Sequence, residues 1–154
     1  MRFLILFIFL ITNVFANDLS DIKNIIIHKD PKTYNNVIFL DKKDQKINIK
    51  DFNENLIILN FWATWCEPCK EEMPSLDKLQ INSKFKNLKV LPINISQESS
   101  KKVEKFFKDL NIQNIESYFD IRSNLPKIFS LRGIPTTILF DTSGKEFARI
   151  IGSI

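Results

Sequence analysis

Two cysteines have the type and the spacing that thiol chemistry needs. Cys66 and Cys69 are the only cysteines in the 154 residues, and only Glu67 and Pro68 lie between them. A cysteine reacts as its thiolate, and a second thiol close to it can resolve the mixed disulfide that the first one forms with a substrate. A disulfide between them would close a small ring and add little loop-closure stabilisation. Redox chemistry therefore explains the pair better than the alternative, a structural disulfide.

The residues around the pair predict which thiol attacks. The apolar run of residues 56–59 predicts a central strand, covered on both faces, that ends near Trp62. A helical pattern begins at Cys66, where unpaired backbone N–H groups and the helix dipole stabilise a thiolate. Pro68 is tolerated in the first turn, since an N–H there has no partner within the helix. We therefore expect Cys66 to be the exposed nucleophile and Cys69 the more buried resolving thiol.

One acidic residue falls on the apolar face of this predicted helix. Cys69, Met73 and Leu76 are spaced as one helix face. Glu72 lies on that same face, whereas Glu71 points elsewhere. Because a buried carboxylate without a partner is costly, this position singles out Glu72.

Composition and charge narrow the class of protein. Hydrophobic residues make up 44% and charged residues 26% of the 154 residues, as in a globular protein with one domain. The net charge of +4 is spread over lysines interleaved with acidic residues and asparagines, which argues against nucleic-acid binding.

Half of a metal site is another alternative for the two cysteines, but zinc usually takes four ligands. The single histidine, His28, lies in a polar stretch and is expected on the surface, so neither a metal nor a cofactor is predicted.

The first residues have the layout of a secretory signal. A positive start, Met1-Arg2, precedes an almost wholly apolar stretch, residues 3–16, whose end resembles a small-residue cleavage site. About fourteen apolar residues reach only ~21 Å as a helix, short of the ~30 Å hydrocarbon core of a membrane. We expect residues 1–16 to be a cleaved signal peptide; the alternative is an uncleaved membrane anchor. Both place the domain outside the cytoplasm, as in the periplasm of a bacterium-like cell.

Alternating strand-like and helix-like periodicities predict one α/β domain. We expect residues 17–36 to form a polar, loosely packed lead-in and residues 37–154 to form the folded domain. Strands are predicted at residues 37–40, 47–49, 56–62, 88–95, 117–119, 136–140 and 146–151. Helices are predicted from Cys66 to about Gln80, over Val103 to Leu110, and from a cap at Ser123 or Asn124 to Gly133.

Two separate motifs resemble the thioredoxin superfamily. The first is Asn60-Phe61-Trp62-Ala63-Thr64-Trp65-Cys66-Glu67-Pro68-Cys69, followed by Glu72 and Pro74, and the second is Gly133-Ile134-Pro135-Thr136-Thr137. The match is closest to the TlpA/ResA-like branch and covers about residues 37–152. The resemblance implies a thioredoxin-like fold, with a central mixed sheet flanked by helices and an added N-terminal hairpin. It also implies an extracytoplasmic thiol:disulfide oxidoreductase that usually acts as a reductase, often on the haem-binding cysteines of cytochrome c.

The same resemblance implies how a substrate is held. Pro135 should be cis and lie beside the cysteines, where the backbone of Ile134 can dock a substrate strand; a trans proline that merely starts a strand is the alternative. Trp65 is expected to shield the thiols and help docking, whereas core packing explains Trp62 equally well. Pro74 resembles the proline that kinks the active-site helix. The predicted substrate-binding residues are Trp65, Glu67, Pro68, Ile134, Pro135 and Thr136.

One departure from the family pattern bears on proton transfer. Thioredoxin carries a buried aspartate where this chain has Asn60, which cannot titrate. Glu72 matches an acidic position of the ResA-like branch, and we hypothesise that it is partly buried, has a raised pKa and exchanges a proton with Cys69. A surface carboxylate in the first turns of the helix is the alternative.

A second departure concerns the last residues. Relatives normally end on a helix that covers one face of the sheet, but here only Ser153 and Ile154 follow Gly152. We therefore expect the final helix to be lacking, either because the chain is a truncated product or because the domain is less stable than its relatives. The uncovered sheet face would expose an apolar patch.

Together these features predict a disulfide reductase that acts on protein substrates, such as the cysteines of apocytochrome c. In an oxidising compartment the oxidised pair must be reduced again, so a membrane electron donor of the DsbD or CcdA type is the expected partner. A disulfide oxidase or isomerase is the alternative that uses the same thiol chemistry, since the reduction potential of the cysteine pair decides whether it reduces or forms substrate disulfides. A noncatalytic thioredoxin-fold binding module or metallochaperone is the alternative from another class. Peroxidase chemistry is disfavoured, because no stretch resembles the peroxiredoxin nucleophile motif.

Overall fold

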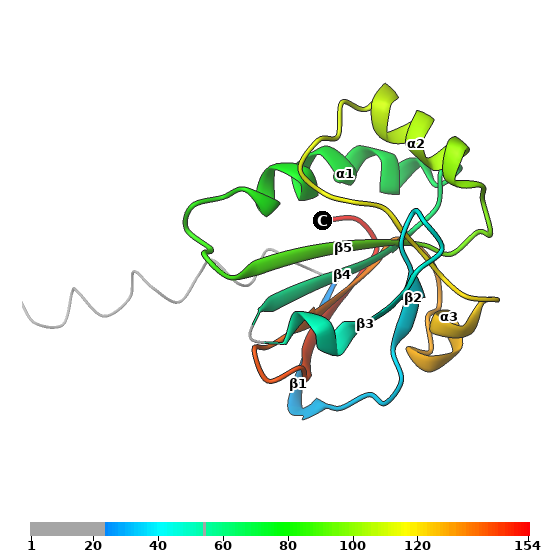
Figure 1. Cartoon of the computed structure of the whole chain (residues 1–154). Helices are drawn as coiled ribbons and strands as arrows, with labels where there is room; N and C mark the ends of the chain where they lie inside the picture. The colour runs from blue at the N-terminus through cyan, green and yellow to red at the C-terminus, as the bar shows by residue number, and fades with distance from the viewer. Residues whose placement is uncertain (1–23, 54) are drawn as a thin grey trace, which may run out of the picture.

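An eight-stranded mixed β-sheet lies at the centre of the computed structural model, which describes residues 24–53 and 55–154 (Figure 1). The strand order is β1-β8-β7-β4-β5-β6-β2-β3. In chain order the elements are β1 (Ile25–Lys32), β2 (Ile38–Leu40), β3 (Lys46–Asn48), the 3-10 helix η1 (Ile49–Phe52), β4 (Leu56–Trp62), α1 (Glu67–Gln80), β5 (Leu88–Asn94), α2 (Ser100–Asp109), β6 (Tyr118–Phe119), α3 (Asn124–Ile128), β7 (Thr136–Phe140) and β8 (Glu146–Ile151). Each strand and helix that the sequence predicted is present, and the α/β class is confirmed.

Burial explains why β4 lies in the middle of the sheet. From Ile57 to Trp62 the strand is buried at every position, which requires cover on both faces. It pairs parallel with β5 and antiparallel with β7, and β6 continues the parallel order beside β5. The carboxyl ends of β4, β5 and β6 therefore meet at one edge of the sheet, where β7 begins. The cysteine motif directly follows β4 and lies at this edge, which we call the carboxyl edge.

Each face of the sheet has its own apolar core. Trp62 joins Met73 and Val103 in a buried cluster on the side of α1 and α2. The preceding residue, Phe61, points to the other face and packs against Phe129, next to α3. This alternation follows the pleat of a strand, and Figure 1 shows α1 and α2 on one side of the sheet and α3 on the other. Burying a Phe or Met side chain contributes ~1.5–3 kcal/mol, so both clusters hold the layers together.

The expected lead-in is partly built into the sheet. Within residues 17–36 the described part begins at residue 24, and β1 pairs antiparallel with β8, with Ile25 opposite Ile150. The backbone of this part is therefore part of the sheet, while most side chains of β1 are exposed. The expectation of a surface histidine is wrong, because the His28 side chain is only 11% exposed and contacts Glu146 of β8. The predicted signal peptide, residues 1–16, lies outside the described residues.

Helix α3 is shorter than its pattern predicted and has a different cap. It ends at Ile128, well before the expected glycine, and the chain then turns through Ser130, which has a left-handed backbone. The side chain of Ser123 makes no capping hydrogen bond. Instead, Oδ1 of Asp120 accepts the N–H of Leu125 at 3.0 Å, so the cap comes from the end of β6.

The chain after β8 runs back over the α1 side of the sheet (Figure 1). There the N–H of Ile154 donates to Oε2 of Glu72 at 3.1 Å. Ala148 and Ile150 on this face of β8 are buried, whereas Ile27 on the neighbouring β1 is 64% exposed. Exposed apolar surface on this face is therefore found at the β1 edge. Among the described residues, no helix is both long and apolar enough to cross a bilayer.

Glu146 is the buried carboxylate that joins β1 and the following loop to β8. Arg149 donates to it through Nε (2.6 Å) and Nη2 (2.8 Å), and the Tyr34 hydroxyl donates to Oε2 at 2.5 Å. The Nε2 atom of His28 lies 2.6 Å from Oε1. Burial opposes ionisation, but the hydrogen bonds from Arg149, Tyr34 and His28 outweigh it and lower the pKa of Glu146 to about 2.

Replacing Glu146 by Gln should remove stability only where the carboxylate is ionised. Its folded pKa of about 2 lies below the ordinary 4.5, so its ionised network stabilises the fold above pH 4.5 and is lost as the pH falls toward 2. We expect the variant to be about 3 kcal/mol less stable than the wild type at pH 6, with the difference closing near pH 2, as measured by urea unfolding. The exposed Asp109→Asn is the matched control and should change stability little. Parallel pH curves for Glu146→Gln and the wild type would contradict this account.

Candidate active site

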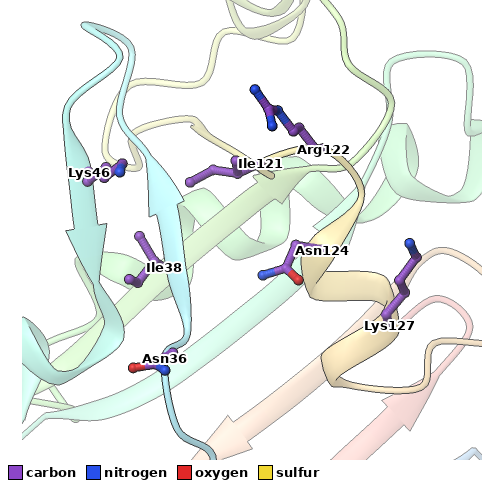
Figure 2. Close-up of a pocket in the computed structure, with 7 residues that line it drawn as sticks. All are labelled: Asn36, Ile38, Lys46, Ile121, Arg122, Asn124 and Lys127. Atoms are coloured by element: carbon purple, nitrogen blue, oxygen red, sulfur yellow. The ribbon is translucent and has the colours of Figure 1, made fainter.

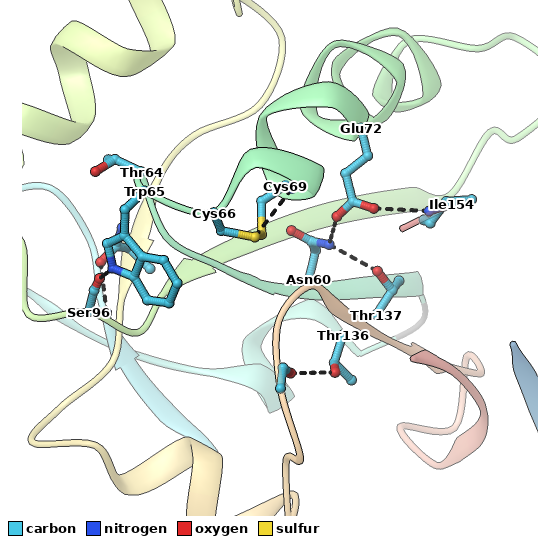
Figure 3. The surroundings of a disulfide bond; sticks show 12 residues. Asn60, Thr64, Trp65, Cys66, Cys69, Glu72, Ser96, Thr136, Thr137 and Ile154 are labelled. Atoms are coloured by element: carbon cyan, nitrogen blue, oxygen red, sulfur yellow. Dashed lines mark hydrogen bonds between the residues drawn. A yellow bond between two sulfur atoms is a disulfide. The ribbon is translucent and has the colours of Figure 1, made fainter. Parts of the chain in front are cut away.

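Cys66 and Cys69 form a disulfide at the start of α1, at the carboxyl edge of the sheet (Figure 3). Their Cα atoms are 5.3 Å apart. Cys66 is the N-cap of α1, and its Sγ accepts the N–H of Cys69 at 3.3 Å. Pro68 lies in the first turn and Pro74 inside the helix, as predicted. When the pair is reduced, this N–H and the helix dipole favour a thiolate at Cys66.

The two sulfurs differ in exposure, but less than expected. Cys66 is 4% exposed and Cys69 is fully buried. The order of exposure matches the assignment of Cys66 as the nucleophile, whereas the expectation of a freely exposed Cys66 is wrong. As the N-cap, Cys66 turns its sulfur toward the helix, and it belongs to the buried cluster that contains Trp62 and Ala63. A substrate disulfide must therefore reach Cys66 at a small opening.

Glu98 holds the loop that leads from β4 to Cys66. Its carboxylate accepts hydrogen bonds from the backbone N–H of Thr64 (3.0 Å) and from the Thr64 hydroxyl. Asn94 (2.8 Å) and Lys102 (2.5 Å) donate to the same carboxylate. Burial opposes ionisation, but the bonds from Lys102, Thr64 and Asn94 prevail and lower the pKa of Glu98 to about 2. Glu98 thus remains ionised and positions the loop.

The sequence did not point to Glu98. It lies 34 residues after Thr64 and just before α2. An acidic residue is common there, because its charge interacts favourably with the helix dipole. The neighbouring Ser96 accepts the indole N–H of Trp65 at 2.9 Å. The loop after β5 is therefore the platform that holds both Thr64 and Trp65, and only the parallel pairing of β4 and β5 brings the two segments together.

Glu72 lies on the buried face of α1, as the helical spacing predicted. It is 3% exposed, so the alternative of a surface carboxylate is wrong. Nδ2 of Asn60 donates to Oε1 of Glu72 at 2.7 Å and to the Thr137 hydroxyl at 2.9 Å, and the N–H of Ile154 donates to Oε2 (Figure 3). Burial raises the pKa of Glu72, and the hydrogen bonds from Asn60 and Ile154 only partly offset it. Glu71 is exposed.

The Ile134–Pro135 peptide bond is cis, as the resemblance implied. β7 begins at the next residue, Thr136, which pairs with Phe61 near the end of β4. Pro135 therefore lies at the carboxyl edge beside the cysteine loop. Ile134 is half-buried and packs against the apolar cluster that contains both cysteines.

The remaining predicted substrate-binding residues differ in accessibility. Trp65 is 69% exposed, and Glu67 and Pro68 are exposed as well. Thr136 is buried, and its hydroxyl donates to the carbonyl of Gly133 at 2.8 Å within its own loop. An incoming protein can therefore touch Trp65, Glu67 and Pro68 directly, whereas the Thr136 side chain shapes the loop.

The arrangement can perform dithiol–disulfide exchange. It combines a thiol at a helix start, a second thiol within disulfide distance, a buried carboxyl group on the helix face of Cys69, and an accessible surface beside them. Within the part of the chain that the structure describes, no three His, Cys, Asp or Glu side chains converge as metal ligands.

Known proteins share both the sequence pattern and the fold. Residues 31–146 match the AhpC/TSA family. A thiol-disulfide oxidoreductase ResA of Bacillus cereus is 31% identical over 117 residues, which are 76% of this chain and 66% of that protein. The chain thus spans 66% of the length of this relative.

Two solved structures extend the comparison to three dimensions. StoA from Bacillus subtilis is 27% identical, with a TM-score of 0.64 over 77% of this chain and 90% of that one. A secreted thiol-disulfide isomerase from Corynebacterium glutamicum is 24% identical, with a TM-score of 0.72 over 88% of this chain and 86% of that one, and it supports the fold alone. The chain therefore belongs to the AhpC/TSA family and has the thioredoxin-like fold that its cysteine and proline motifs indicated.

Proposed function

We propose that the protein is an extracytoplasmic thiol:disulfide oxidoreductase that reduces disulfides in protein substrates. The observation that carries the proposal is the Cys66–Cys69 pair at the start of α1, with the cis Pro135 at the same sheet edge and Glu72 buried on the face of Cys69. Similarity to ResA, named as a thiol-disulfide oxidoreductase, supports it.

The reaction follows from the positions of the two sulfurs. The Cys66 thiolate attacks one sulfur of the substrate disulfide, and the other substrate sulfur leaves as a thiolate that takes a proton from water. The Cys69 thiol gives its proton to the Glu72 carboxylate and attacks Sγ of Cys66. The bond between Cys66 and the substrate breaks, and the second substrate sulfur leaves as a thiolate that takes a proton from solvent, while Glu72 returns its proton to solvent. The substrate is then a dithiol, and Cys66 and Cys69 are left as a disulfide. Two electrons have passed to the substrate, so a donor must reduce the pair again.

Compartment, substrate and donor complete the proposal. The pattern of residues 1–16 supports export, with this segment as a signal peptide or as a membrane tether. In an oxidising compartment the donor is a membrane protein of the DsbD or CcdA type. The substrates are protein disulfides such as those of apocytochrome c, as the resemblance to the ResA-like branch implies.

Serine substitutions should separate the roles of the two cysteines. Cys66→Ser should reduce insulin or a disulfide peptide no faster than the uncatalysed background, because no nucleophile is left at the opening. Cys69→Ser should still attack, and it should accumulate a mixed disulfide between Cys66 and the substrate, measured by mass spectrometry without reductant. If the adduct accumulated on Cys66→Ser instead, the order of attack would be reversed.

Replacing Glu72 by Gln tests the proton transfer. In the wild type, resolution by Cys69 should accelerate as the pH rises through the raised pKa of Glu72, because only the carboxylate accepts a proton. In Glu72→Gln this inflection should vanish, and resolution at neutral pH should be about 100-fold slower in stopped-flow measurements. Glu71→Gln on the exposed face of α1 is the matched control and should leave the profile unchanged. A wild-type profile in Glu72→Gln would rule out the role.

The reduction potential distinguishes a reductase from an oxidase. We expect equilibration of the domain with glutathione or dithiothreitol to give a value near that of thioredoxin, ~-270 mV. A value near that of DsbA, ~-120 mV, would instead make the protein a donor of disulfides. Stoichiometric metal binding without any turnover would indicate a metallochaperone and contradict the proposed activity.

A further inference from the structure

The segment that leads from β6 to the cis proline carries only positive charge. Residues 121–135 contain Arg122, Lys127 and Arg132 and no acidic residue. All three side chains are exposed. Because β6 runs parallel to β4 and β5, this segment starts at the carboxyl edge, and it ends at Pro135 of the candidate site. The two ends of this positively charged segment therefore lie at the same edge of the sheet as Cys66.

Two pockets on either side of this segment extend the positive surface. The first, of about 620 Å³, lies between α3 and the β2–β3 hairpin and is lined by Lys46, Arg122 and Lys127 (Figure 2). Asn124 extends from the first turn of α3 toward β2 in this pocket. The second, of about 380 Å³, is lined by Lys32 and Arg132 and reaches Thr136 at the start of β7. Neither pocket is lined by a carboxylate.

The charge of these pockets is not neutralised within the described part of the chain. We define the basic flank as five exposed residues: Lys32, Lys46, Arg122, Lys127 and Arg132. Among residues 24–53 and 55–154, none of the five forms an ion pair, whereas Arg149 in the second pocket is neutralised by Glu146. A third pocket, at the ends of β5 and β6, contains carboxylates, among them Asp120 and Glu98, of which Glu98 is paired with Lys102.

We propose that the basic flank binds an acidic segment of the protein substrate, next to the disulfide that Cys66 attacks. This inference rests on the proposed function and adds the class of substrate that the site selects. Unpaired lysines and arginines around two open pockets are complementary to glutamate and aspartate side chains, and the asparagine in the larger pocket adds a hydrogen-bonding group. Such charge complementarity accelerates encounter by about 10-fold or more at low ionic strength and weakens as salt screens it.

Two peptides with the same disulfide test the selectivity. One has glutamates and the other has lysines at the positions that flank the cysteines. We expect kcat/KM for the acidic peptide to exceed that for the basic peptide by about 10-fold at low salt, and the ratio to fall toward one as ionic strength rises. The double variant Arg122→Glu/Lys127→Glu should abolish or invert the preference.

Lys84→Glu/Lys86→Glu is the matched control, with the same change of charge. These exposed lysines lie between α1 and β5, at the opposite edge of the sheet, so the preference should persist. Circular dichroism checks that each variant is folded. Equal kcat/KM for the two peptides in the wild type, or an equal effect of both double variants, would overturn the proposal.

Binding without turnover separates this inference from the proposed function. Fluorescent peptides with serine in place of both cysteines should bind by anisotropy only when acidic, and only if Arg122 and Lys127 are intact. Selective binding without reduction of any disulfide peptide would support the basic flank and contradict the reductase. A different outcome is that phosphatidylglycerol vesicles retain the protein through Arg122 and Lys127 and that the protein binds both peptides equally. That result would overturn the proposal and assign the surface to a membrane.

Discussion

The capping of α1 by Cys66 is the constraint on which the rest of the site depends. Because β4 is apolar on both faces, it lies in the middle of the sheet, and its end delivers the chain to the carboxyl edge. There the Cys66 sulfur meets the N–H of Cys69 at 3.3 Å and the positive end of the helix dipole. A sulfur in the middle of the helix would have neither. Glu98 completes the arrangement, since it holds the connecting loop through Thr64.

Two buried carboxylates, Glu72 and Glu146, and the half-buried Glu98 differ in pKa because their hydrogen-bond donors differ. Glu72 accepts only neutral amide N–H groups, so the cost of burial prevails and its pKa is raised. Glu98 also accepts a hydrogen bond from the cationic Lys102, and Glu146 accepts two from the cationic Arg149. The pKa of each carboxyl group is therefore lowered to about 2. The first is suited to exchange a proton with a neighbouring thiol, whereas the other two stay ionised and hold segments together. In our proposal Glu72 serves the chemistry, whereas Glu98 and Glu146 hold segments of the chain together.

The outer strands of the sheet and its central strands have different roles. The central strands place the cysteines, the cis proline and Glu72 within one buried neighbourhood. The outer strands β1 and β3 contribute Lys32 and Lys46, which complete the walls of the two pockets beside residues 121–135. In our proposal the residues placed by the central strands transfer the electrons, and the two pockets recognise the protein that receives the electrons. Substrate choice can then change with surface charge while the buried chemistry is kept.

The sequence by itself determined the elements whose signal is local. The apolar run of β4 and the helical spacing that puts Glu72 on the face of Cys69 were predictable, because period and burial are written in neighbouring residues. The position of the cis Pro135 followed instead from the resemblance of two motifs to the thioredoxin superfamily. Only the tertiary structure decided the pairing of β1 with β8, the low exposure of Cys66 and the hydrogen bond from Thr64 to Glu98. Each of these depends on a partner many residues away, so burial and hydrogen bonding across the folded sheet, and not local propensity, select it.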